Sequence, residues 1–205
     1  MTAAHIELLV EEPSMEAFLV SLLPRILSDE ISFQVHPFQG KSDLMKELEG
    51  RLRGYSSWLP DNWRVVVVVD RDNEDCFTLK AKMEGIADRS GLLTRAKSSG
   101  HPWQLVNRIA IEELEAWYFG DWPAVVAAYP RVNQNVPNQA SFRDPDAIGG
   151  GTWEAFERTL QRHGYFKTGL RKIEAAREIA IHFEPGLNRS ASFRKLHGAL
   201  LEATA

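Results

Sequence analysis

Acidic residues collect directly behind three short apolar runs of this 205-residue chain. Glu11 and Glu12 follow the first run. Asp70 and Asp72 follow an unbroken run of valines, and Glu115 lies just behind the third run. Carboxylates gathered in a half-buried cleft repel one another unless a proton or a cation neutralises them, and their hard oxygen atoms favour Mg²⁺ or Mn²⁺ over zinc. The pattern therefore predicts a divalent metal site and, because Mg²⁺ is often shared with substrate phosphates, phosphate chemistry.

Four predicted strands would position these carboxylates. They are residues 6–10, 31–35, 65–69 and 109–111. The valine run 65–69 lacks polar alternation, which is typical of a strand buried on both faces in a parallel sheet covered by helices. Apolar and polar residues alternate over 31–35, which predicts a strand near the sheet edge. Ligands of open α/β sheets bind beyond the carboxyl ends of the strands, so acidic clusters far apart in sequence are expected to converge there.

Local geometry gives two more expectations for the acidic residues. Along an extended chain, alternate side chains share one side, so Asp70 and Asp72 are expected to lie side by side, with Cα atoms ~7 Å apart and Arg71 pointing away. Acidic residues behind a strand also commonly cap the next helix. Glu112 and Glu113 suit that role in a helix expected over 112–119. For three acidic strand ends together, we favour the metal site over capping.

Charge and helix signals divide the chain into a core and an extension. The formal net charge is −4, yet basic residues dominate 158–195. This segment is either an ordinary solvated helix surface or a face that contacts phosphates. Ser14 is the expected N-cap of the first helix. Asn, Pro and Gly over 131–151 predict a long loop, so we expect an α/β core at 1–130 and a loop with a basic helical extension, packed on that core, at 131–205.

The composition excludes several classes of protein. The single cysteine, Cys76, cannot form an internal disulfide or a thiolate zinc site. No apolar run approaches the ~20 residues that span a bilayer, and the first residues lack a signal-peptide pattern. A cytoplasmic protein without membrane association is expected.

Several segments of the sequence resemble a known family. They are LLVEEPSMEAFL (8–19), HPFQGKSDLMKEL (36–48), VVVVVDRDNEDC (65–76), ELEAWYFGD (113–121) and NRSASF (188–193). Together they resemble, over nearly the whole chain, the TOPRIM-like family catalogued as domain of unknown function 4276. The resemblance implies a TOPRIM or Rossmann-like α/β fold with a mainly parallel sheet of about four strands flanked by helices. TOPRIM domains of topoisomerases, primases and overcoming-lysogenization-defect nucleases bind Mg²⁺ for phosphodiester chemistry.

The resemblance assigns expected roles to single residues. Glu11 matches the family's glutamate after the first strand, Asp70 and Asp72 match its Asp-x-Asp, and Glu115 matches the acidic residue of its Glu-x-Trp segment. The implied activity is a metal-dependent phosphodiesterase or nuclease acting on DNA or RNA. Glu11, Asp70 and Asp72 would hold Mg²⁺ or Mn²⁺, and Glu115 would assist.

The basic segment 158–195 offers the cation that such chemistry needs. Lys167 or Arg171 is the expected residue that stabilises developing phosphate charge.

Departures from the family pattern keep other functions open. Where the family usually has glycine after its glutamate, this chain has Glu12. Where many members have a second acidic residue, it has Met15, with Glu16 beside it. One alternative is a non-catalytic, metal-binding regulatory subunit of the ABC or SMC-like ATPases that accompany related proteins in bacterial anti-phage defence. A phospho-accepting receiver domain is a weaker alternative, because Asp-x-Asp and a basic extension have no place in that pattern.

Overall fold

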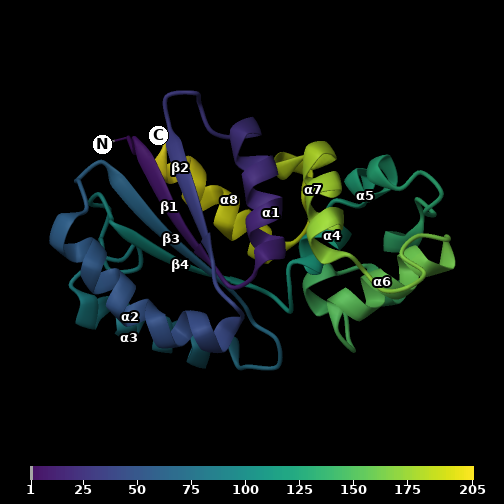
Figure 1. Ribbon diagram of the computed structural model, residues 1–205, viewed down its shortest axis with the longest axis horizontal. Coiled ribbons are helices and arrows are strands. Elements are labelled where there is room, and N and C mark those ends of the chain that lie inside the picture. Colours follow the sequence, from purple (N-terminus) through teal and green to yellow (C-terminus); the bar gives the residue numbers. More distant parts are fainter. Residues whose placement is uncertain (1) are drawn as a thin grey trace.

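The computed structural model describes residues 2–205, and its centre is a parallel sheet of four strands (Figure 1). The strands are β1 (His5–Val10), β2 (Ser32–Pro37), β3 (Trp63–Asp70) and β4 (Leu105–Ala110). They lie in the order β2-β1-β3-β4, and every neighbouring pair is parallel. The predicted α/β class, with a parallel sheet of about four strands, is confirmed, and β2 lies at the expected edge.

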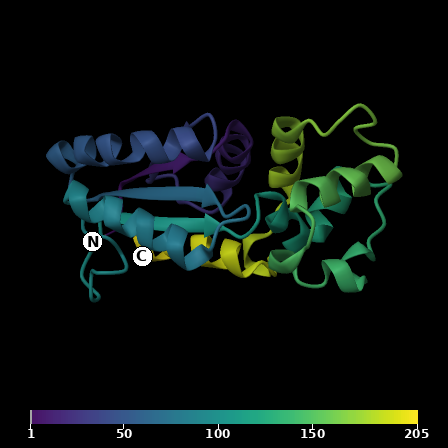
Figure 2. The same cartoon turned by 90° about the horizontal axis from the view of Figure 1, so that it is seen from below.

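Helices cover both faces of this sheet. They are α1 (Pro13–Leu22), α2 (Lys41–Trp58), α3 (Cys76–Ser90), α4 (Glu115–Gly120), α5 (Trp122–Ala128), α6 (Thr152–Arg162), α7 (Lys172–His182) and α8 (Ala191–Ala203). Helices α1 and α8 pack on one face, and α2 and α3 pack on the other (Figure 2). No helix in residues 2–205 is long and apolar enough to cross a membrane.

The valine run of β3 explains why the sheet is covered on both sides. Val66 and Val68 belong to the apolar cluster with α1 and α8, whereas Val65, Val67 and Val69 belong to the cluster with α2 and α3. All five side chains are fully buried. Because successive side chains of a strand point to opposite faces, an uninterrupted apolar strand must lie between two helical layers.

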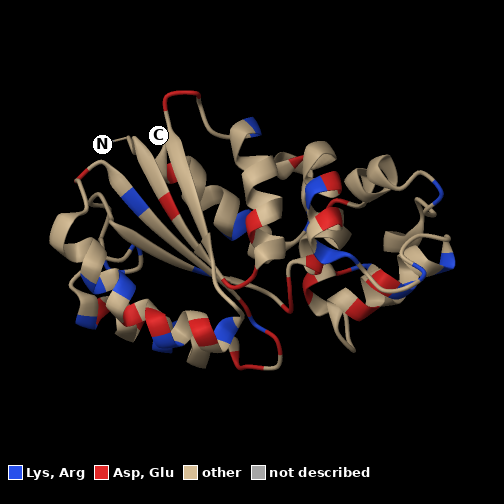
Figure 3. Ribbon diagram, in the orientation of Figure 1, with Lys and Arg blue, Asp and Glu red and all other residues tan. Residues whose placement is uncertain are grey.

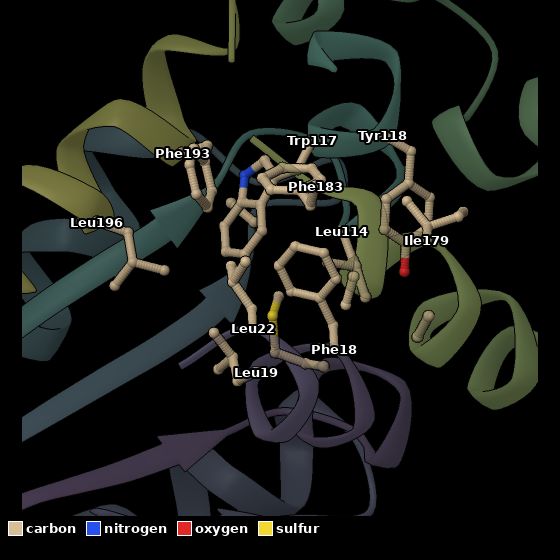
Figure 4. Packing of buried hydrophobic residues seen from close by; sticks show 14 of the residues in the cluster. Phe18, Leu19, Leu22, Leu114, Trp117, Tyr118, Ile179, Phe183, Phe193 and Leu196 are labelled. Atoms are coloured by element: carbon tan, nitrogen blue, oxygen red, sulfur yellow. The ribbon is translucent and has the colours of Figure 1, made fainter. Parts of the chain in front are cut away.

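A cluster of aromatic side chains joins α1, on the sheet, to the helices α4 to α7. Phe18 of α1 lies against Trp117 of α4 and meets Phe183, just after α7, edge to face with ring centroids 4.9 Å apart (Figure 4). Helix α7 packs along α1, and α5 packs on α7. The later helices are therefore fixed beside the carboxyl ends of the strands. The division of the chain at residue 130 stays a prediction.

Two local expectations are wrong. Helix α1 begins at Pro13, whose missing amide hydrogen suits the first helical position, and the N-cap is Glu12 rather than Ser14. The Ser14 hydroxyl instead donates to the Glu12 carboxylate. The helix expected from Glu112 begins only at Glu115, because Glu112 has the left-handed φ of 60° and turns the chain behind β4.

The predicted loop at 131–151 holds only short 3₁₀ turns, at Val136–Asn138, Ala140–Phe142 and Pro145–Ala147.

Candidate metal centre

The carboxyl ends of β1 and β3 meet where the sheet reverses its winding. From β1 the chain crosses to β2 on one side, and from β2 it crosses back over β1 to β3. Ligands of open α/β sheets bind in the crevice at such a switch point. Glu11 follows β1, and its Oε2 accepts a hydrogen bond of 3.0 Å from the backbone amide of Asp70, the last residue of β3. The two acidic clusters converge as expected, and acidic residues line the loops at this end of the sheet (Figure 3).

Asp70, the last residue of β3, is a deeply buried acid of this cluster. Its side chain is 5% exposed, and its Oδ1 atom is buried without a hydrogen-bond partner. Burial raises the pKa of Asp70 well above its usual value, and the negative charges of Glu11, Glu12 and Glu115 raise it further. A buried carboxylate with an oxygen that has no donor, surrounded by other acids, is unfavourable in its charged form until a proton or a cation reaches it.

Glu115 brings the third strand end into the same cluster. It is the first residue of α4, is 1% exposed, and has a buried Oε2 without a hydrogen-bond partner. Burial raises the pKa of Glu115 to about 7, although the charge of Lys172 opposes the shift. The Glu115 carboxyl can therefore exchange a proton near neutral pH, which suits a general acid or base.

Glu11 is similarly perturbed. Burial raises its pKa, although the hydrogen bond from the Asp70 amide and the charge of Lys41 oppose that shift.

The extended backbone expected from Asp70 to Asp72 is wrong. The extended strand ends at Asp70, and Asp72 has the left-handed φ of 50°, so the two-residue alternation of a strand stops between them. Asp72 Oδ2 accepts a 2.7 Å hydrogen bond from Lys41 Nζ, which also contacts the Arg71 carbonyl at 3.1 Å. A second acid, Glu74, lies 3.1 Å from the same ammonium group. Asp72 therefore lies at the rim of the cluster, held by a lysine from α2.

Lys172 is the cation of the basic segment that faces the acids. Its Nζ lies 3.7 Å from Glu12 Oε1 and 5.4 Å from the centroid of the Trp153 ring. Burial lowers the pKa of Lys172, but the charges of Glu115, Glu12 and other nearby acids outweigh burial and raise it. The sequence carried a signal for this residue. Lys172 begins the apolar stripe of α7 that continues at 175, 176 and 179, so its stem had to point inward.

The basic residues expected near phosphate lie elsewhere. Lys167 is exposed in the turn before α7, and exposed Arg171 pairs with Glu174 at 2.6 Å. Neither has a contact with the acidic cluster in the part of the chain that the structure describes. The role proposed for either residue falls more naturally to Lys172.

Two acids beside the cluster have partners of their own. Glu112 pairs with Arg71. Glu113 Oε2 accepts hydrogen bonds from the Thr152 hydroxyl at 3.0 Å and the Trp153 amide at 2.9 Å, at the start of α6. The capping role considered for Glu113 is therefore real, but it serves a helix far along the chain instead of the next one.

Comparison with known proteins places the chain in a family. A model of a domain of unknown function, DUF4276, matches residues 10–201. The chain belongs to the DUF4276 family. No curated protein gives a significant match to it. Among solved structures, it is similar to the C-terminal region of the Burkholderia pseudomallei OLD protein, with 18% identity, a TM-score of 0.49 and full coverage of both chains.

The carboxylates of this DUF4276 protein have the chemistry that suits a hard cation, but those that the structure describes are not arranged as a metal site. Within residues 2–205, no three His, Cys, Asp or Glu side chains are arranged to hold a metal ion. Glu11 accepts a hydrogen bond from the Asp70 amide, and Asp72 accepts one from Lys41. The unpartnered oxygens of Asp70 and Glu115, and the raised pKa values of both, nevertheless indicate that Lys41 and Lys172 do not fully neutralise the acids. The assignment of Glu11, Asp70 and Asp72 as metal ligands stays a prediction.

Proposed function

We propose that this protein is a Mg²⁺- or Mn²⁺-dependent phosphodiesterase that cleaves nucleic acid. The observation that carries this proposal is the buried Asp70 carboxylate, with its Oδ1 unpartnered, among other acids at the switch point of a parallel sheet. Carboxylates of this kind bind a hard cation, and such cations typically complete their coordination with substrate phosphate oxygens. The sequence resemblance to TOPRIM nucleases points to the same chemistry.

Each residue of the cluster has a role in this proposal. Glu11, Asp70 and Asp72 hold the metal, which when bound polarises the phosphate and activates water. Glu115 takes up or releases a proton, because its pKa of about 7 lies close to neutral pH. Lys172 stabilises the negative charge that develops on the phosphate. Lys41 holds the Asp72 carboxylate at the rim of the cluster.

A second function has one specific observation in its favour. Many family members carry an acidic residue at the position of Met15. Met15 lies on α1, is 1% exposed and packs in the apolar core, so this position supplies no oxygen ligand. A protein with fewer ligands could bind metal without cutting. In that case it would be a regulatory subunit of an ABC or SMC-like ATPase. With or without cleavage, we place the protein in cytoplasmic anti-phage defence with such an ATPase as its partner.

A combined binding and cleavage experiment separates these functions. Mg²⁺ and Mn²⁺ are titrated by calorimetry into the wild type and Asp70→Asn/Asp72→Asn, and cleavage of plasmid DNA and of a structured RNA is followed on the same samples. The matched control is Asp29→Asn/Glu30→Gln, which removes two charges from an exposed loop.

Metal-dependent cleavage that is lost in Asp70→Asn/Asp72→Asn and kept in Asp29→Asn/Glu30→Gln supports the nuclease function. Metal binding without cleavage favours the regulatory subunit. Equal metal affinity in all three proteins contradicts both functions.

A further inference from the structure

A separate cleft of about 280 Å³ lies between α6 and the loop that precedes it. Polar and cationic side chains line much of it. Those that matter here are Gln139, Ser141, Arg158, Thr159 and Arg162. The two arginines are four residues apart on α6, so they lie on one face of the helix, about 6 Å apart along its axis. The cleft therefore offers two neighbouring guanidinium groups and several neutral hydrogen-bonding groups.

The positive charge of this cleft is not neutralised by nearby acids. Arg158 and Arg162 are exposed, and neither forms an ion pair within residues 2–205. Glu157, next to Arg158, accepts a 2.7 Å hydrogen bond from the Leu170 amide instead. Asp146, on the loop, accepts from the Ser190 hydroxyl and from the Ser192 amide. In a protein with a net charge of −4, this is a local positive surface.

Helix α6 connects this cleft to the candidate metal centre. The helix starts at Thr152 and Trp153, which donate to Glu113 beside the acidic cluster, and Lys172 lies over the Trp153 ring. From Trp153, Arg158 lies about 8 Å and Arg162 about 14 Å along the helix axis. Arg158 and Arg162 thus lie progressively farther from the acids along the helix axis, on the side of α6 that is turned away from Trp153 and Lys172.

We propose that this cleft binds the phosphodiester backbone of the nucleic-acid strand that leads away from the metal centre. This inference rests on the proposed function, because it assumes a nucleic-acid substrate. The planar guanidinium group donates two parallel hydrogen bonds to a phosphate, which makes arginine well suited to this task. A cluster of acids repels a polyanion, so cations outside the metal centre are needed to hold the strand.

Binding measured over a salt series tests this cleft. A fluorescein-labelled single-stranded oligonucleotide, as DNA and as RNA, is titrated with Arg158→Gln/Arg162→Gln in EDTA, which prevents cleavage. Loss of two phosphate contacts should weaken binding and reduce the slope of log K against log salt by about 1.4. The matched control is Arg194→Gln/Lys195→Gln, which removes two exposed charges from α8 and should keep the wild-type slope.

The outcomes separate this inference from the proposed function. A slope reduced only in Arg158→Gln/Arg162→Gln, with Mn²⁺ affinity unchanged by calorimetry, supports the cleft. Equal slopes in the two double variants overturn the proposal that the cleft binds the strand. The nuclease proposal is then untouched if the wild type still cleaves. A wild type that binds neither oligonucleotide overturns the cleft and contradicts the proposed substrate as well.

Discussion

Two buried carboxylates on neighbouring central strands have opposite surroundings. Glu7 of β1 is 7% exposed and Asp70 of β3 is 5% exposed. Glu7 accepts hydrogen bonds from the His5 ring at 3.1 Å, the His36 ring at 2.5 Å and the Tyr55 hydroxyl at 3.0 Å. Asp70 has an oxygen with no donor at all, although the two side chains are buried to the same degree. Burial alone therefore does not mark a functional acid.

The neighbours decide the role of each carboxylate. Donors surround Glu7, so its charge is satisfied inside the fold without a ligand. Other acids surround Asp70, and each of them makes its ionised form less favourable. An arrangement that destabilises the protein without a ligand is expected only where a ligand removes the penalty. The comparison thus supports the site proposed at the carboxyl end of the sheet.

The largest expected difference between the two carboxylates is in activity. Asp70→Asn should reduce metal-dependent cleavage by at least ~100-fold, because even residues that only orient metal ligands have effects of that size. Glu7→Gln should keep cleavage at a temperature where it is folded. Initial rates of plasmid nicking in Mn²⁺ measure both. A Glu7→Gln variant that is folded but inactive would break the comparison.

A smaller difference is expected in how stability depends on pH. The pKa of Glu115 is raised from 4.5 to about 7 in the folded protein, so the folded state keeps its proton while the unfolded state has lost it. The free energy of unfolding of the metal-free protein should therefore fall as pH rises through this window, by on the order of 3 kcal/mol. Glu115→Gln should flatten that slope. Urea unfolding in EDTA across the pH range measures it, and a wild-type stability that rises over this window contradicts the assignment.

Replacing Glu7 should lower the stability of the protein, whereas replacing Asp70 should not. Glu7→Gln removes the charged acceptor shared by His5, His36 and Tyr55 and leaves buried donors poorly matched. We expect a loss of ~1–3 kcal/mol in the free energy of unfolding near neutral pH. Asp70→Asn should cost nothing in EDTA, or stabilise the protein, because it removes a repelled charge. Denaturant unfolding of the two variants, run side by side, checks the sign of each effect.

The smallest effect is expected for an acid near the cluster that already has its partners. Glu113→Gln keeps an oxygen acceptor for the Thr152 hydroxyl and the Trp153 amide and loses only the charge at the start of α6. It should cost at most ~1 kcal/mol and preserve cleavage. Thermal unfolding and the same nicking assay test this. A large loss of activity would contradict this prediction and indicate that Glu113 belongs to the metal centre.

The sequence predicted the regular parts of the molecule well. The valine run of β3 and the alternation of β2 follow from hydrophobic period, which is a local property. The convergence of Glu11 with Asp70 followed from one general rule, that parallel strands end at a common edge.

The irregular parts were not predictable by the same means. The left-handed turn at Asp72 comes from the path of the chain beyond the strand, where alternation gives no information. The apolar stripe of α7 shows that Lys172 points inward, but its contact with the acids depends on how α7 packs along α1, which is a tertiary contact. Glu7 looked like an ordinary polar residue of a strand, because its three donors come from positions 5, 36 and 55.

The effect of Mn²⁺ on thermal stability tests the central claim, that the acidic cluster binds a divalent cation, most directly. Melting temperatures of the wild type, Asp70→Asn and Glu7→Gln are compared in EDTA and in Mn²⁺, above the pKa of Glu115. At 100 times its dissociation constant, Mn²⁺ should raise the melting temperature of the wild type and of Glu7→Gln by about 5–10 °C, and that of Asp70→Asn by far less. An equal shift in all three proteins, or no shift in the wild type, would contradict the claim.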